Sequence, residues 1–136
     1  MSDAKTPPPN VWPTLRATDA RALMTFLADA FGFVESAAYG EGDVIHHAEM
    51  LWPEGGGIML GSDRQDGSIW ALRPGTFGAY VVTADPDGIY ERAKRAGAEI
   101  LQELNETDYG SRGFSVRDPE GNLWSFGTYP GEPLPS

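Results

Sequence analysis

The groups that could do chemistry in this 136-residue chain are few and lie close together. The chain contains two histidines, His46 and His47, and no cysteine. Adjacent side chains on a strand point to opposite faces, so the two imidazoles are not expected to bind one metal ion together. His47 and Glu49 are two residues apart and share a face. They can form an acid–base pair, a two-point metal site or a hydrogen-bonded pair that lines a polar cavity, and the residues alone leave these alternatives open.

The composition excludes several classes of site and partner. Without cysteine the chain has no disulfides, thiolate zinc sites or cysteine nucleophiles. The formal net charge of −10 argues against nucleic acid as a partner, because neutralising phosphates needs a basic face. No apolar run approaches the roughly 18 residues of a membrane-spanning helix, and the first residues lack the layout of a signal peptide. We therefore expect a cytoplasmic single domain over residues 1–136, with no nucleic-acid or membrane partner.

The chain contains one sequence pattern twice. Pro-Glu-Gly at residues 53–55 recurs at 119–121, and Gly61 has its counterpart in Gly127, with an offset of 66 residues in both cases. An aspartate opens a helical pattern in each copy at the same offset. A constant offset at three separated points indicates an internal duplication of about half the chain.

Both copies predict the element order βαβββ. In the first, a strand at 11–17 precedes a helix that Thr18 can cap and Gly32 ends. In the second, a strand at 79–83 precedes a helix capped by Asp85. Three short strands follow each helix, at about 33–40, 43–52 and 57–62, and then at 98–103, 111–117 and 122–128. The expected modules cover 11–62 and 78–128, with a linker at 63–77 and extended proline-rich tails.

Several motifs make this pattern similar to a known superfamily. They are Thr18-Asp19-Ala20, Ala30-Phe31-Gly32-Phe33, His47-Ala48-Glu49-Met50 and Arg117-Asp118-Pro119-Glu120-Gly121-Asn122-Leu123-Trp124. Over residues 11–128 the chain resembles the vicinal oxygen chelate superfamily, which includes glyoxalase I, extradiol dioxygenases, fosfomycin-modifying enzymes and bleomycin resistance proteins. The resemblance implies an α+β fold, in which two βαβββ modules form a cupped, mostly antiparallel eight-stranded sheet with helices on its outer face.

The resemblance also implies where a metal ion would be held. Metal-dependent members use four side chains, His, Glu or Gln, from the first and last strands of each module. The equivalent positions fall near Trp12 and at Gly78 or Ala79 on the first strands, and at Met59 and Ser125 on the last strands. These residues are not a competent ligand set for hard divalent ions. We therefore expect no metal site, no cofactor and no catalytic residue of the inherited kind.

The leading hypothesis is a metal-free binding protein similar to the bleomycin resistance branch. It would be a homodimer that sequesters a hydrophobic or aromatic, antibiotic-like ligand, and its acidic charge would favour a cationic one. The expected ligand-binding residues are Trp12, His47, Glu49, Met59, Trp70, Ser115 and Ser125. Two alternatives remain: a metal-dependent lyase or dioxygenase with relocated ligands, and a dimeric interaction module without a small ligand. The sequence also leaves open whether the modules pair within one chain or between chains.

Overall fold

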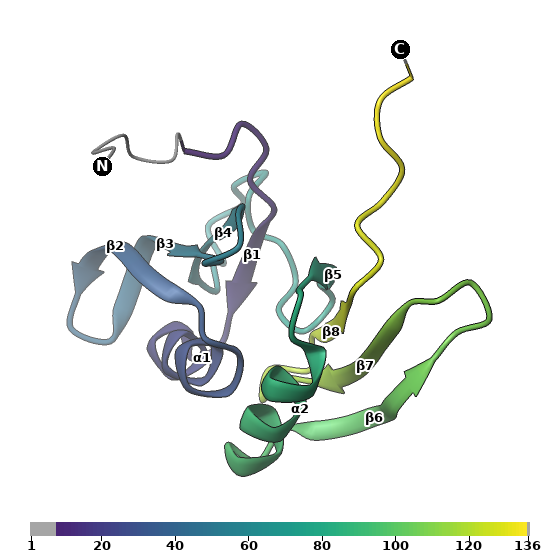
Figure 1. The fold of residues 1–136 in the computed structure, drawn as a ribbon. Coiled ribbons are helices and arrows are strands. Elements are labelled where there is room, and N and C mark those ends of the chain that lie inside the picture. The colour runs from purple at the N-terminus through teal and green to yellow at the C-terminus, as the bar shows by residue number, and fades with distance from the viewer. Residues whose placement is uncertain (1–7, 136) are drawn as a thin grey trace, which may run out of the picture.

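The computed structural model describes residues 8–135, which form an α+β fold with two βαβββ modules, as expected from the sequence. The eight strands are divided between two four-stranded sheets (Figure 1). Sheet A has the order β1 (Thr14–Ala17), β4 (Gly57–Ser62), β3 (Val44–Leu51), β2 (Val34–Glu41). Sheet B repeats this order with β5 (Gly78–Val82), β8 (Leu123–Gly127), β7 (Arg112–Arg117) and β6 (Glu99–Glu106). In each sheet the first and last strands of the module pair in parallel, and the other pairs are antiparallel.

The helices begin and end for local reasons. Helix α1 (Ala20–Phe26) continues into a wider π-helical turn, η1 (Leu27–Phe31), which ends at Gly32 in the left-handed conformation. The sequence-based prediction that Thr18 caps α1 is wrong, because the Asp19 carboxylate accepts the hydrogen bond from the backbone N–H of Ala22 at 3.1 Å. An aspartate and a threonine are both good N-caps, so composition does not separate neighbouring candidates. Helix α2 (Pro86–Arg95) begins at the predicted cap, Asp85, which accepts from Gly88 at 3.0 Å.

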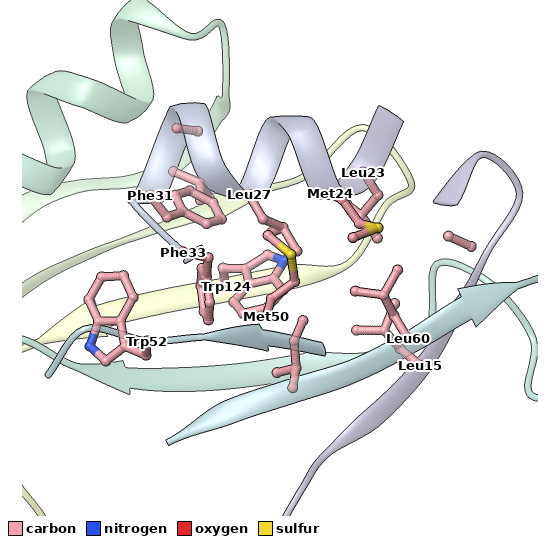
Figure 2. Close-up of a cluster of buried hydrophobic side chains, with 14 of the residues drawn as sticks. Leu15, Leu23, Met24, Leu27, Phe31, Phe33, Met50, Trp52, Leu60 and Trp124 are labelled. Carbon is pink, nitrogen blue, oxygen red and sulfur yellow. The ribbon is translucent and has the colours of Figure 1, made fainter. Parts of the chain in front are cut away.

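One hydrophobic core runs through both modules. The rings of Phe31 and Phe126 lie 4.6 Å apart, and the rings of Phe33 and Trp124 lie 5.6 Å apart, so the end of the first helix packs on strand β8 of the second module. Figure 2 shows Leu27 pointing from the helix toward Met50 of sheet A, with Trp124 beside them. Trp124 and Phe126 alternate with Ser125 in the sequence, which predicts that both pack under a helix in the core. Both are fully buried, which confirms this prediction. Each sheet therefore uses one face for the shared core and helices.

Two glutamate carboxylates, one from each module, also join the modules by hydrogen bonds. Glu120, in the hairpin between β7 and β8, accepts hydrogen bonds from the backbone N–H groups of Thr18 and Asp19 at 2.7 and 2.8 Å, at the start of α1. Glu54, in the hairpin between β3 and β4, accepts from Thr83 Oγ1 at 2.7 Å and from the backbone N–H of Ala84 at 2.8 Å, just before α2. We call these contacts the reciprocal glutamate contacts. They explain the repeated Pro-Glu-Gly, because each copy satisfies donors at the N-terminus of the other module's helix.

Asp118 fixes the hairpin that carries Glu120. This buried carboxylate accepts hydrogen bonds from the backbone N–H groups of Glu120 and Asn122, and from the side chains of Asn122 and Trp124, at 2.8 to 3.0 Å. A buried carboxylate is tolerated when its lone pairs are satisfied in this way. The first module has Trp52 at the equivalent position, so the two hairpins reach the same geometry by different means.

The reciprocal glutamate contacts predict a loss of stability in both modules when either is removed. Glu54→Gln and Glu120→Gln should each lower the free energy of unfolding by about 1 kcal/mol, as the loss of a helix cap does, and the double variant should lose more than either. Urea unfolding followed by tryptophan fluorescence measures this. Glu41→Gln, an exposed residue at the end of β2, is the charge-matched control. Equal stability of all four variants would contradict the assignment.

Candidate ligand-binding site

The face of each sheet that is turned away from the core carries the candidate site residues. We call these the open face of sheet A and the open face of sheet B. On sheet A, Glu49 and Met59 are direct cross-strand partners, and Thr14 is the partner of Met59. Side chains alternate along a strand, so His47 shares this face with Glu49. The sequence-based grouping of His47, Glu49 and Met59 on one face agrees with this register.

The same row exists on the open face of sheet B, 66 residues later. Tyr80 is the partner of Ser125, and Ser125 is the partner of Ser115. The row Thr14–Met59–Glu49 of sheet A thus corresponds, position for position, to Tyr80–Ser125–Ser115 of sheet B. The duplication is visible in the strand register as well as in the motifs.

His47 and Glu49 form a hydrogen-bonded pair on sheet A. The distance from His47 Nε2 to Glu49 Oε2 is 2.8 Å, and both side chains are partly exposed. The ring of Tyr39, from β2, stacks on the imidazole with centroids 6.4 Å apart and planes at 15°. This geometry is compatible with two of the uses foreseen from the sequence. The polar pair can orient a bound group, and the imidazole, which is hydrogen-bonded to a carboxylate, can exchange a proton.

Ser115 and Ser125 lie at a small pocket on sheet B. Their hydroxyl oxygens are 3.1 Å apart, Ser115 Oγ lies 3.2 Å from Gln102 Oε1, and Ser125 Oγ donates to the carbonyl of Phe114 at 3.3 Å. The pocket has a volume of about 160 Å³ and is also lined by Tyr80 and Tyr109. We call it the serine pocket. Its hydroxyls and amides can hydrogen-bond a polar group of a ligand.

Three tyrosines beside the serine pocket were missed by the sequence analysis. Tyr80 donates through its hydroxyl to the carbonyl of Tyr129 at 2.8 Å, and the rings of Tyr109 and Tyr129 meet edge to face with centroids 5.9 Å apart. The hydrogen bond from Tyr129 to Glu132 raises the pKa of this phenol above its usual value, so it stays a neutral donor. Once the strand register identifies Thr14, the offset of 66 gives Tyr80 as its counterpart.

The tryptophans divide into different environments. Trp12 lies against Gly57 at the start of β4, where a Cβ would come within 2.9 Å of its ring. Trp52 is buried and donates through its indole N–H to the carbonyl of Val82 at 3.0 Å, so it joins the modules. Trp70 is half exposed in the linker and lines neither the serine pocket nor the larger pocket described next. The structure therefore does not bring Trp70 together with the other predicted ligand residues.

A larger pocket of about 430 Å³ lies between the two modules. It is lined on one side by residues of the first module and on the other by strand β5, with Phe33, Trp52 and Trp124 among its aromatic walls. We call it the seam pocket. Tyr80 lines both this pocket and the serine pocket, so an apolar cavity adjoins the polar one. The sequence analysis treated Trp124 as core only and did not foresee this cavity.

The strand register gives the direct first-strand partners of the expected last-strand positions. Met59 pairs with Thr14 and Ser125 pairs with Tyr80, whereas Trp12 and Gly78 lie two residues earlier in the sequence. A thioether, two aliphatic hydroxyls and a phenol do not fit a hard divalent ion, which prefers carboxylate or imidazole donors. Within residues 8–135, no three or more His, Asp or Glu side chains come together as a possible metal site.

Comparison with known proteins places the chain in a family. The model of the glyoxalase/bleomycin resistance protein/dioxygenase superfamily matches residues 11–126. The chain belongs to this superfamily. The match spans both βαβββ modules and confirms the resemblance drawn from the motifs.

The chain is also similar to individual proteins, in sequence or in structure. An uncharacterized protein from Mycobacterium bovis is 32% identical over 127 residues, which cover 88% of this chain and 82% of the relative. The crystal structure of TioX from Micromonospora sp. ML1 has a TM-score of 0.72 and 26% identity, and covers 87% of this chain and 98% of TioX. A superfamily member from Sphaerobacter thermophilus has a TM-score of 0.66 and 17% identity, covering 84% and 91% of the two chains.

The described helices are not suited to cross a membrane. Neither α1 nor α2 has the length and apolar character needed to cross a bilayer, and this holds for the whole part of the chain that the structure describes.

The contact between Trp12 and Gly57 predicts that this glycine positions the tryptophan. Gly57→Ala should displace the indole and lower the free energy of unfolding by about 1–3 kcal/mol, because the new Cβ also approaches the carbonyl of Met50 within 2.7 Å. A shift of the Trp12 indole N–H signal in ¹H–¹⁵N NMR and a urea titration measure both effects. Gly78→Ala, at the start of β5, is the matched control, since its Cβ would approach no atom closer than 3.8 Å. An unmoved Trp12 signal in Gly57→Ala would contradict the contact.

Proposed function

We propose that this superfamily member is a metal-free protein that binds and sequesters a small hydrophobic or aromatic molecule. The observation that carries the proposal is the identity of the four residues in the ligand positions of the two modules. Thr14, Met59, Tyr80 and Ser125 can contact an organic ligand by hydrogen bonds and apolar surface, whereas they are poor donors for a catalytic metal ion. This supports capture without bond breaking.

The chemistry of the site favours an aromatic ligand, and a cationic one in particular. Trp12, the Tyr39 ring on His47 and the three tyrosines beside the serine pocket offer stacking surfaces, and Glu49 offers a carboxylate. The net charge of −10 raises the local concentration of cations around the protein. Flat, cationic, antibiotic-like molecules combine these properties, so a role in antibiotic resistance inside the cytoplasm is part of this proposal.

A homodimer is part of the same proposal. Both open faces carry exposed apolar side chains, among them Tyr39 on sheet A and Tyr80, Val82 and Leu123 on sheet B. Burial of apolar surface of this kind is favourable. A second copy of the chain would supply the facing surface, with its sheet B opposite sheet A of the first copy. The ligand would then lie between the open face of sheet A of one protomer and the open face of sheet B of the other.

The enzyme alternative has one observation in its favour. The His47–Glu49 pair, with Nε2 and Oε2 at 2.8 Å, resembles a proton-transfer pair and supplies two ligands of the type that metals take. A metal-dependent lyase or dioxygenase would need further donors beside this pair. The open face of sheet A offers Met59 and Thr14 as its neighbours in the row, which are unsuited to that role.

Binding can be tested directly by isothermal titration calorimetry against a panel of flat, cationic, aromatic antibiotics. We expect saturable binding of at least one compound at micromolar protein, and a loss of about tenfold in affinity for Trp12→Ala and for Glu49→Gln, since each removes a stacking or charge contact. Glu41→Gln changes the same charge on the same sheet away from the site and should bind like the unchanged protein. Absence of heat across the panel would contradict the proposed ligand class.

The dimer can be tested by sedimentation velocity. We expect a species of twice the 14.7 kDa chain mass at micromolar concentration, and a shift toward the monomer for Leu123→Glu, which places a charge on the open face of sheet B. Val11→Glu, an exposed residue ahead of β1, is the control for an added charge on an apolar residue. A monomer at all concentrations would contradict the shared site.

A further inference from the structure

Arg16, on strand β1, is a buried cation without a partner among residues 8–135. Only 9% of its surface is exposed, and its Nε atom is buried with no hydrogen-bond acceptor. An unpaired charge in such a place is costly, and natural proteins compensate it with an opposite charge or a ligand. Arg16 therefore lacks the opposite charge or ligand that usually compensates a buried cation, within the described chain.

The fold fixes this guanidinium in place. Its neighbours along β1, Leu15 and Ala17, are buried in the core, so Arg16 points to the opposite, open face of sheet A. There it lies over Gly61, its direct partner on β4, and a Cβ on Gly61 would overlap with Arg16 Nη1. The absence of a side chain at residue 61 makes room for the guanidinium beside β4, the one strand that pairs with β1.

A pocket of about 280 Å³ opens beside Arg16. Its lining includes His46, Ser62 and Arg64, together with the carboxylates of Asp63 and Asp66. The Ser62 hydroxyl accepts from the backbone N–H of Ile45 at 2.8 Å, which leaves its own proton free to donate. The pocket thus combines the Ser62 hydroxyl with a guanidinium, and both groups bind oxyanions.

The two carboxylates of the pocket are engaged elsewhere. Asp66 accepts two hydrogen bonds from Arg64, at 2.8 and 3.2 Å, which lowers the pKa of this carboxyl and leaves Arg16 without it. Asp63 accepts from the amide of Gln65 at 3.3 Å. Burial lowers the pKa of Arg16, and the charge of Arg64 lowers it further, against the opposing effect of Asp66. A bound anion would offset the repulsion between Arg16 and Arg64.

We propose that Arg16 and Ser62, with His46 and Arg64 at the rim, form a binding site for a small oxyanion, a phosphate or carboxylate group. The planar guanidinium matches both groups through paired N–H donors. The anion is either a free ion or the acidic group of a larger ligand that extends over the open face of sheet A. This inference goes beyond the proposed function, because Arg16 lies within β1, Trp12 lies two residues before β1 begins, and the anion site does not require a cationic ligand.

Thermal unfolding with inorganic phosphate and with acetate tests the site in the full chain, with chloride added to keep the ionic strength constant. We expect a saturable rise in the melting temperature with phosphate, acetate or both. In Arg16→Met the apparent affinity should fall by about tenfold or more, the effect of removing a charged hydrogen-bond donor. Arg73→Met, an exposed linker arginine, removes the same charge elsewhere and should keep the response. A rise with phosphate alone assigns the site to phosphate groups, and a rise with both assigns it to oxyanions generally.

An NMR measurement on the unchanged protein keeps the proposal testable if Arg16→Met fails to fold. The Nε–Hε signal of Arg16 should move saturably on addition of phosphate or acetate, while that of Arg73 stays in place. The proposal is overturned if neither anion moves the Arg16 signal, if no saturable rise in melting temperature occurs, or if Arg16→Met responds as the unchanged protein does.

Discussion

The mutual contact between the two modules is the constraint on which the rest of the structure depends. Glu54 and Glu120 each accept two hydrogen bonds, at 2.7 to 2.8 Å, from donors near the helix start of the other module. The donors are two backbone N–H groups for Glu120, and one hydroxyl and one backbone N–H for Glu54. The shared aromatic core around Phe31 and Trp124 then has a fixed geometry. Because the core and helices occupy one face of each sheet, the opposite faces stay uncovered within the chain, and these faces carry the candidate site residues.

The strand register places the duplicated positions of the two modules in corresponding rows of the two sheets, and the residue types in these rows differ. Thr14, Met59 and Glu49 form a row on the open face of sheet A, and Tyr80, Ser125 and Ser115 form the corresponding row on sheet B. One half keeps an ionisable pair, His47 and Glu49, and the other keeps neutral hydroxyls and phenols. The proposed function rests on this superfamily fold together with side chains that suit an organic ligand.

The sequence predicted the fold well because the internal repeat and the hydrophobic pattern are local or periodic signals. The offset of 66 and the hydrophobic pattern gave the βαβββ order, the cap at Asp85 and the burial of Trp124, and alternation alone placed His47 with Glu49. The missed features depend on long-range geometry. Residue type does not separate Asp19 from Thr18 as the cap, and the backbone N–H groups of both residues are bound by Glu120, from the other module. The seam pocket, the Thr14 and Tyr80 positions and the unpartnered Arg16 follow from strand register and packing, which one sequence does not encode locally.

The proposed function holds that the open faces of this superfamily member bind an organic ligand and hold no metal ion. Elemental analysis of the purified protein, after incubation with nickel, zinc, iron and manganese and removal of free ions, tests it most directly. The residues at Thr14, Met59, Tyr80 and Ser125 predict that no metal is retained in proportion to the chain. One tightly held ion per site, removed by a chelator and lost in Glu49→Gln, would contradict the account and would favour the enzyme alternative.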